Sequence, residues 1–229
     1  MRFKLLLFFL TLLPNLGFAQ EFHFGMKAGV PLTSSFEGYY VSSPIRRYTV
    51  GASAELRFGA HFRIEVDGIY KRIGYSATFD CGLRCQPYVI SYPDIFGWHI
   101  SDSVDVAANS WEFPIMAKYS FPGFVHPFVA GGFSVRHVGV ASGSYQSTDE
   151  RFGPGVPGGP ITTITDQTSS RLPNSVYSGV VVYAGFEIGR KHFRVLPEFR
   201  YTHWFQNDTS WGLASFTSNQ AEILVGFLF

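Results

Sequence analysis

Charged side chains at alternate positions, as in Arg63, Glu65 and Asp67, are the residues of this chain that could do chemistry. A spacing of two places them on one face of a strand. Basic and acidic residues interleave on such faces, which favours a network of ion pairs, because a buried charge without a partner is costly. Eight basic and seven acidic residues follow this pattern: Lys27, Glu55, Arg57, Arg63, Glu65, Asp67, Lys71, Glu112, Lys118, Arg136, Glu187, Arg194, Glu198, Arg200 and Glu222.

Cys81 and Cys85 are the only cysteines in the sequence. In an oxidising compartment this pair is expected to form a disulfide. A metal site would need further ligands nearby at zinc-finger spacing, and the sequence has none there. No cofactor is expected, and no residue set predicts a metal site.

The amino terminus predicts export. Met1–Ala19 has Arg2 and Lys4 at its start, then an apolar run, then small residues before a cleavage position, as in a signal peptide. The expected domains are therefore a signal peptide at 1–19 and one further domain at 20–229. Aromatic residues make up 17% and charged residues only 15%, which suits a sheet with an apolar outer surface and does not suggest nucleic-acid binding.

Segments with a period of two follow one another along the chain. The face opposite the charged residues is apolar and contains no charge until Arg72 and His203. In the fifth segment both Phe128 and Val129 are apolar, and we expect Val129 to point outward. The eight segments are 22–32, 48–58, 61 to about 75, 110–121, about 127–138, 176–190, 192–205 and 220–229.

The connections between the segments alternate in length. Three are short, at 59–60, 122–126 and 189–191, and four are long, at 33–47, 76–109, 139–175 and 206–218. Short turns at one end and long loops at the other are typical of outer-membrane barrels. We therefore expect an all-β fold: an eight-stranded antiparallel up-and-down transmembrane β-barrel with short periplasmic turns and long extracellular loops. A soluble periplasmic barrel is the rival fold.

The charged face would then line the bore. Eight strands leave an interior about wide enough for side chains alone, so the charges are expected to fill it. A narrow ion path through the charged side chains remains the alternative.

Several short motifs support the same fold. Three motifs resemble strands of the bacterial outer-membrane beta-barrel domain family, of the small OmpA- and OmpX-like porin-family type: Trp111-Glu112-Phe113-Pro114-Ile115, the run from Pro127 to Gly132 on the next strand, and Pro197-Glu198-Phe199-Arg200-Tyr201. The terminal Phe229 is similar to the signal that the barrel-assembly machinery recognises. The resemblance implies an eight-stranded barrel located in the cell outer membrane, but no single activity.

His203 suggests one enzymatic alternative. Small lipid A deacylase barrels carry a histidine with a serine two residues later, and here that position is Phe205. Without this nucleophile no catalytic residue is assigned, and a non-enzymatic structural or surface-interaction role is expected. The partners expected are outer-membrane lipid, the barrel-assembly machinery and an extracellular ligand bound through the four long loops.

Overall fold

The structure is a computed structural model of the 229-residue chain. It describes residues 21–38, 41–43, 48–81, 97–123, 125–152, 160–170, 175–190, 193–205, 210–211 and 214–229. The proposed signal peptide lies outside these ranges. None of the described residues forms a helix long and apolar enough to span a bilayer.

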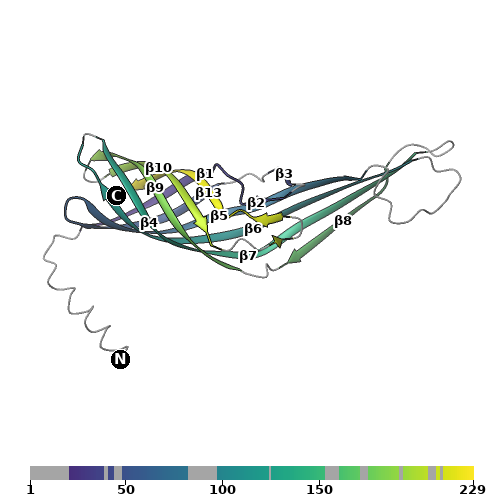
Figure 1. The fold of residues 1–229 in the computed structure, drawn as a ribbon, viewed down its shortest axis with the longest axis horizontal. Coiled ribbons are helices and arrows are strands. Elements are labelled where there is room, and N and C mark those ends of the chain that lie inside the picture. The colour runs from purple at the N-terminus through teal and green to yellow at the C-terminus, as the bar shows by residue number, and fades with distance from the viewer. Residues whose placement is uncertain are drawn as a thin grey trace, which may run out of the picture.

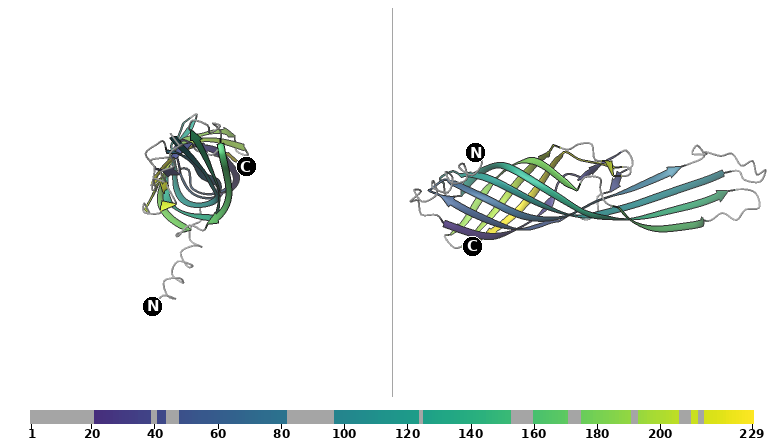
Figure 2. Two further views of the ribbon diagram at one scale, coloured as in Figure 1. Left: turned by 90° about the vertical axis from the view of Figure 1, so that its right-hand side faces the viewer. Right: turned by 90° about the horizontal axis from the view of Figure 1, so that it is seen from below.

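Eight antiparallel strands form a closed ring, which confirms the predicted barrel (Figure 1; Figure 2, left). Around the ring each strand pairs with the next in the order β5-β4-β1-β13-β10-β9-β7-β6, and β6 pairs back with β5. The strands are β1 (Glu21–Pro31), β4 (Thr49–Phe58), β5 (Phe62–Cys81), β6 (Gly97–Ser120), β7 (His126–Phe152), β9 (Val176–Arg190), β10 (Phe193–Trp204) and β13 (Asn219–Leu228).

The side chains of the ring alternate between the bore and the outside. On β7, Phe128 is buried, whereas Val129 and Phe133 are about half exposed. The outward phase predicted for Val129 is therefore confirmed. Outward positions are almost all apolar because lipid contacts them, and inward positions carry the charges.

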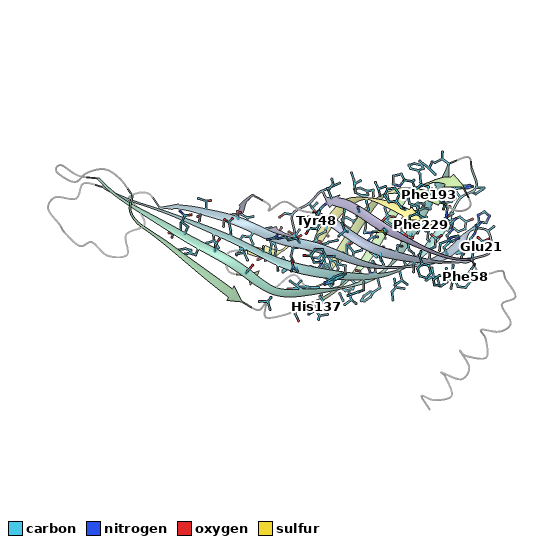
Figure 3. The ribbon with its side chains drawn as sticks, turned by 180° about the vertical axis from the view of Figure 1, so that it is seen from behind. Glu21, Tyr48, Phe58, His137, Phe193 and Phe229 are labelled. Carbon is cyan, nitrogen blue, oxygen red and sulfur yellow. The ribbon has the colours of Figure 1, made fainter. Side chains whose placement is uncertain are left out.

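The two ends of the barrel differ. Gly59 adopts a positive φ of 68° in the short turn between β4 and β5, a conformation that glycine tolerates. Glu21, Phe58, Phe193 and Phe229 gather at this end, and Tyr48 lies toward the other (Figure 3). Both the first described residue and the carboxyl terminus thus lie at the end with the short turns, as the even strand number requires.

Aromatic side chains mark two levels on the outside of the barrel. Tyr70 contacts both Tyr48 and Trp111 at the upper level, and Phe62 packs on Tyr119 at the lower level. Trp111 and Tyr119 lie eight residues apart on β6. At about 3.3 Å per residue and a tilt of about 40°, this separation is about 20 Å, close to the roughly 25 Å apolar band of such barrels.

In the described residues, the long connections contain strands where the sequence predicted irregular loops. β5, β6 and β7 continue far beyond the ring, and β8 (Pro160–Ser170) pairs with β7, so that much of 76–109 and 139–175 is strand (Figure 2, right). We call the part formed by 76–81, 97–109, 139–152 and 160–170 the outer sheet. Its strands pair with one another and so satisfy one another's backbone hydrogen bonds.

The other two long connections also contain strands. β2 (Phe36–Glu37), β12 (Ala214–Phe216) and β11 (Ser210–Trp211) form a separate small sheet, which we call the lid, and β3 (Val41–Ser43) pairs with β5. Thr217 N donates a hydrogen bond to Ser35 O at 3.0 Å, so the segments flanking the lid strands from 33–47 and 206–218 are joined.

Candidate functional site

The bore of the barrel holds almost all of the charged residues that the sequence placed there. Their residues are at most 6% exposed, and none of them reaches the lipid. The buried set is Lys27, Glu55, Arg63, Glu65, Asp67, Lys71, Glu112, Lys118, Arg136, Glu187, Arg194, Glu198, Arg200 and Glu222.

Arg57 is the exception, and its predicted place in the network needs correction. Its side chain is 33% exposed, and its described ion pair is with Glu21 at 3.3 Å. It also donates hydrogen bonds to Gly59 O and Ala60 O. Arg57 occupies the last inward position of β4 before the turn, so it lies at the rim of the barrel instead of within it.

The inner end of the bore contains two arginines and two glutamates. Arg63 Nη1 lies 3.1 Å from Glu55 Oε1 and also contacts Glu187. Arg194 Nη1 lies 2.7 Å from Glu187 Oε1 and 3.3 Å from Glu55 Oε1. Each cation is thus shared by two carboxylates, and the four side chains close this end of the bore.

Lys118 connects this cluster to the middle of the bore. Glu55 and Glu65 stand directly opposite each other on β4 and β5, where like charges repel. Lys118 Nζ lies 3.0 Å from Glu55 Oε2 and 3.1 Å from Glu65 Oε2, and it stands 4.1 Å from the centre of the Phe128 ring. The bridging ammonium group offsets the repulsion between the carboxylates.

Lys27 is the centre of the middle layer. Its Nζ contacts Glu65 and lies 3.1 Å from Asp67 Oδ2 and 3.0 Å from Glu198 Oε1. Arg200 Nη2 lies 2.6 Å from the same Asp67 oxygen and 3.3 Å from Glu198 Oε1. Two cations therefore hold three carboxylates from two walls of the barrel.

The outer layer joins four charged residues and one amide. Lys71 Nζ lies 2.7 Å from Glu112 Oε2 and contacts Glu222. Arg136 donates to Glu112, with Nε at 2.7 Å, and to the side-chain oxygen of Gln220. Across the three layers seven cations, counted without Arg57, balance seven carboxylates, so the described network is neutral.

An aromatic core lies directly above the charged layers. Trp204 is the residue of this core nearest to the charged layers. The Arg136 guanidinium lies 4.1 Å from the centre of the Trp204 ring. Phe36 and Phe216 of the lid pack with their ring centres 4.4 Å apart and contact Tyr75 and Tyr177, respectively. The lid thus covers the outer mouth of the barrel with apolar side chains.

The base of the outer sheet belongs to the same core. Ile73, Tyr75 and Ala77 of β5 and Val106 of β6 are buried against the lid. Farther out the same face is less covered: Val104 is half-buried and Tyr145 is 37% exposed. The pairing of β7 with β6 shifts register between Ala108 and Ser110 of β6, which pair with Ala141 and Val138. The extra residue in β7 inverts the alternation of its side chains, so that Val138 points inward before the shift and Ala141 after it.

The remaining predicted site residues lie elsewhere. Cys81 ends β5, but its side chain and all of Cys85 lie outside the described residues, so the disulfide stays a prediction. His203 is on the outer surface, and its Nδ1 lies 2.8 Å from Asn219 Oδ1. Phe229 is exposed at the inner end, next to Phe193. The described residues hold no cluster suited to a metal ion.

Two parts of the site, the lid and the outer sheet, were not predicted from the sequence. Phe36 and Phe216 are two of several aromatics in the predicted loops 33–47 and 206–218, and nothing in the sequence marks them as a lid. The outer sheet did leave a signal, because Ala77, Val104 and Val106 alternate with polar residues. Its low apolar content made this alternation hard to recognise.

A closed ring of eight strands, with an apolar outside, aromatic belts and a bore filled by ion pairs, defines an outer-membrane β-barrel protein. A sequence profile of the outer membrane protein beta-barrel domain matches residues 18–207. The chain belongs to this family and is located in the outer membrane. No curated protein matches its sequence.

Solved structures of three other proteins align with this chain at low sequence identity. Neisserial surface protein A is 13% identical, with 92% of this chain and 97% of that chain covered and a TM-score of 0.48. Ail, the attachment invasion locus protein of Yersinia pestis, is 9% identical over 92% of this chain and 97% of its own, with a TM-score of 0.41. The amino-terminal barrel domain of Pseudomonas aeruginosa OprF is 11% identical over 91% and 97%, with a TM-score of 0.36.

Proposed function

We propose that this protein is a non-enzymatic surface-interaction protein, in which the barrel is the anchor and the outer sheet contacts an extracellular partner. The observation that carries the proposal is the contrast between the two halves of the molecule. The bore is filled and capped, whereas the outer sheet consists of paired strands and extends well beyond the mouth (Figure 1). A sheet whose strands are already paired by hydrogen bonds loses less conformational entropy on binding than a flexible loop does.

The neutral network of ion pairs in the bore argues that the barrel is not a channel. An ion crossing the bore would have to displace salt bridges from three successive layers and then pass the aromatic lid. Separating buried ion pairs is costly because each charge loses its partner in a region of low dielectric constant.

Planar-bilayer recording tests the sealed bore. The purified protein is expected to give no stepwise conductance, even at high protein load, because no water-filled path crosses the three layers. A reproducible conductance whose ion selectivity changes with Glu65→Gln, in protein that still shows heat-modifiable migration, would show that ions cross the charged bore, and the channel alternative would then replace the proposal.

The surroundings of His203 support a non-enzymatic role. Its ring is bonded to Asn219, which Tyr201 OH also contacts at 2.7 Å. Asparagine is neither a general base nor a nucleophile, so this trio lacks the groups that acyl transfer needs. His203→Ala is expected to leave the lipid A species of expressing cells unchanged.

Shortening the outer sheet tests the interaction role. Thr78 pairs with Ser103 and Gln146 pairs with Thr165, so residues 79–102 and 147–164 can each be replaced by the turn Asn-Gly without changing the register. The shortened barrel should fold, as judged by heat-modifiable gel migration. On an array of immobilised extracellular proteins and glycans, vesicles with the full chain should bind at least one ligand and shortened vesicles none. Equal binding by both would contradict the proposal.

A further inference from the structure

The inner face of the outer sheet is only partly covered. Residues directly opposite each other on neighbouring strands share a face. Ala77 pairs with Val104, Val104 with Tyr145, and Tyr145 with Asp166, so these four positions continue the face that packs on the lid. Within the described part of the chain, the lid core reaches Ala77 and Val104, and Tyr145 beyond it is exposed.

Three acidic residues occupy positions on this same face. Asp166 pairs with Tyr145, Asp102 pairs with Ser147, and Asp149 pairs with Ile100. Oδ1 of Asp102 is buried without a hydrogen-bond partner among the described residues. By register, the inner face therefore combines apolar positions with positions of acidic residues.

The charge of the whole outer sheet is strongly negative. It contains the acidic residues Asp80, Asp102, Asp105, Asp149, Glu150 and Asp166 against the single basic residue Arg151, and it contains no lysine. The full chain, in contrast, has 18 basic and 17 acidic residues. The excess negative charge thus lies in the part of the protein that extends outward.

This charge decides among the possible occupants of the face. A second copy of the sheet would place like charges against each other, and a polyanion would be repelled in the same way. A cationic polypeptide would be attracted, and its apolar side chains could cover Tyr145 and Val104.

We propose that the inner face of the outer sheet binds a lysine- or arginine-rich, partly apolar segment of another protein. This inference rests on the proposed interaction function and names the chemistry of the partner. Charges are screened over about 8 Å at physiological salt, so the cationic groups of the partner must lie close to the aspartates. An alternating segment can do this because its basic and apolar side chains recur at the spacing of a strand.

The experiment uses the full chain, refolded in zwitterionic phosphatidylcholine vesicles. The probes are a fluorescent peptide of six Lys-Val repeats, the corresponding Glu-Val peptide, and sucrose octasulfate as a polyanion. Fluorescence anisotropy with the Lys-Val peptide should give saturable binding that weakens with salt. The Glu-Val peptide should not bind, and sucrose octasulfate should not displace the Lys-Val peptide from the protein.

Matched variants locate the binding face. The triple variant Asp102→Asn, Asp149→Asn, Asp166→Asn should weaken Lys-Val binding about tenfold or more, because three negative charges at positions on one face are lost. Asp80→Asn with Asp105→Asn, on the opposite face, should change it less than about twofold. Tyr145→Ser should weaken binding about fivefold, whereas Gln146→Ser, the next residue on the other face, should have no effect.

The outcomes separate this inference from the proposed function. Equal losses in the two aspartate variants, no loss in the triple variant, or tighter binding of sucrose octasulfate than of the Lys-Val peptide would overturn the cationic partner. If one of these results is found but the shortened barrel loses its array ligand, the interaction role is kept and only the cationic partner is rejected. If shortening changes neither array nor peptide binding, both would fail. Heat-modifiable migration of each variant excludes misfolding as the cause.

Discussion

Gly132→Val is expected to prevent the barrel from closing. Gly132 faces the bore on β7, between its register partners Met116 and Val181, which are both buried. A Cβ atom placed there would stand 2.0 Å from Ile115 O and 2.8 Å from Met116 Cα. Both are backbone atoms of the neighbouring strand, so neither can move away without breaking the β6–β7 pairing. Overpacking of this kind costs about 1–3 kcal/mol when side chains can adjust, and here they cannot.

The adjacent Gly131 provides the control. It faces outward, and a Cβ atom there would stand 3.7 Å from the nearest Val182 methyl group, an ordinary contact. Gly131→Val should therefore refold into vesicles with the yield of the wild type, while Gly132→Val should give little or no heat-modifiable form. Similar yields for the two variants would show that the strands at this position are not packed as described.

Lys27→Met is expected to destabilise the folded barrel by about 3–5 kcal/mol, the usual cost of removing one partner from a buried ion pair. Lys27 contacts Glu65, Asp67 and Glu198, and its removal leaves these three carboxylates with only Lys118 and Arg200. Adding Glu198→Gln to this variant should restore part of the loss, because it removes one uncompensated charge.

Arg57→Met is the matched control for the charge itself. Arg57 also occupies an inward position in the alternating pattern, but its ion pair at the rim is partly exposed. Loss of the Arg57 charge should therefore change the free energy of unfolding by less than about 1 kcal/mol. Equilibrium unfolding by guanidinium chloride in vesicles measures both variants. Equal effects of Lys27→Met and Arg57→Met would contradict the difference between a buried network and an exposed rim.

The barrel could be predicted from the sequence because each strand has lipid on one side and the charged bore on the other. This requires apolar and polar residues to alternate. Between Val176 and Arg190, for example, a shift of one residue would turn Glu187 toward lipid, and the structure places β9 at those same bounds. The charged residues of the bore follow from the same constraint, since each alternates with a residue that contacts the membrane.

Where the membrane ends, this constraint is lost. The outer sheet has water on its polar face, where Ser76, Ser103 and Ser144 lie. Serine at an exposed position is as compatible with a loop as with a strand, so the sequence does not distinguish the two. The bulge in β7 then shifts the alternation by one residue, which is why the predicted segment stopped at Val138. Arg57 was misplaced for a related reason: alternation shows the direction of a side chain but not its depth along the bore.

The seven cations and seven carboxylates of the bore come from all eight strands of the ring, from Lys27 on β1 to Glu222 on β13. No incomplete ring can pair all of these charges, and Lys71 lacks its contact with Glu222 until the last strand is in place. An unfinished barrel must therefore keep its interior hydrated, and water can leave only when the first and last strands meet. Closure of the seam should thus be the step that commits the chain to the membrane, with few stable intermediates before it.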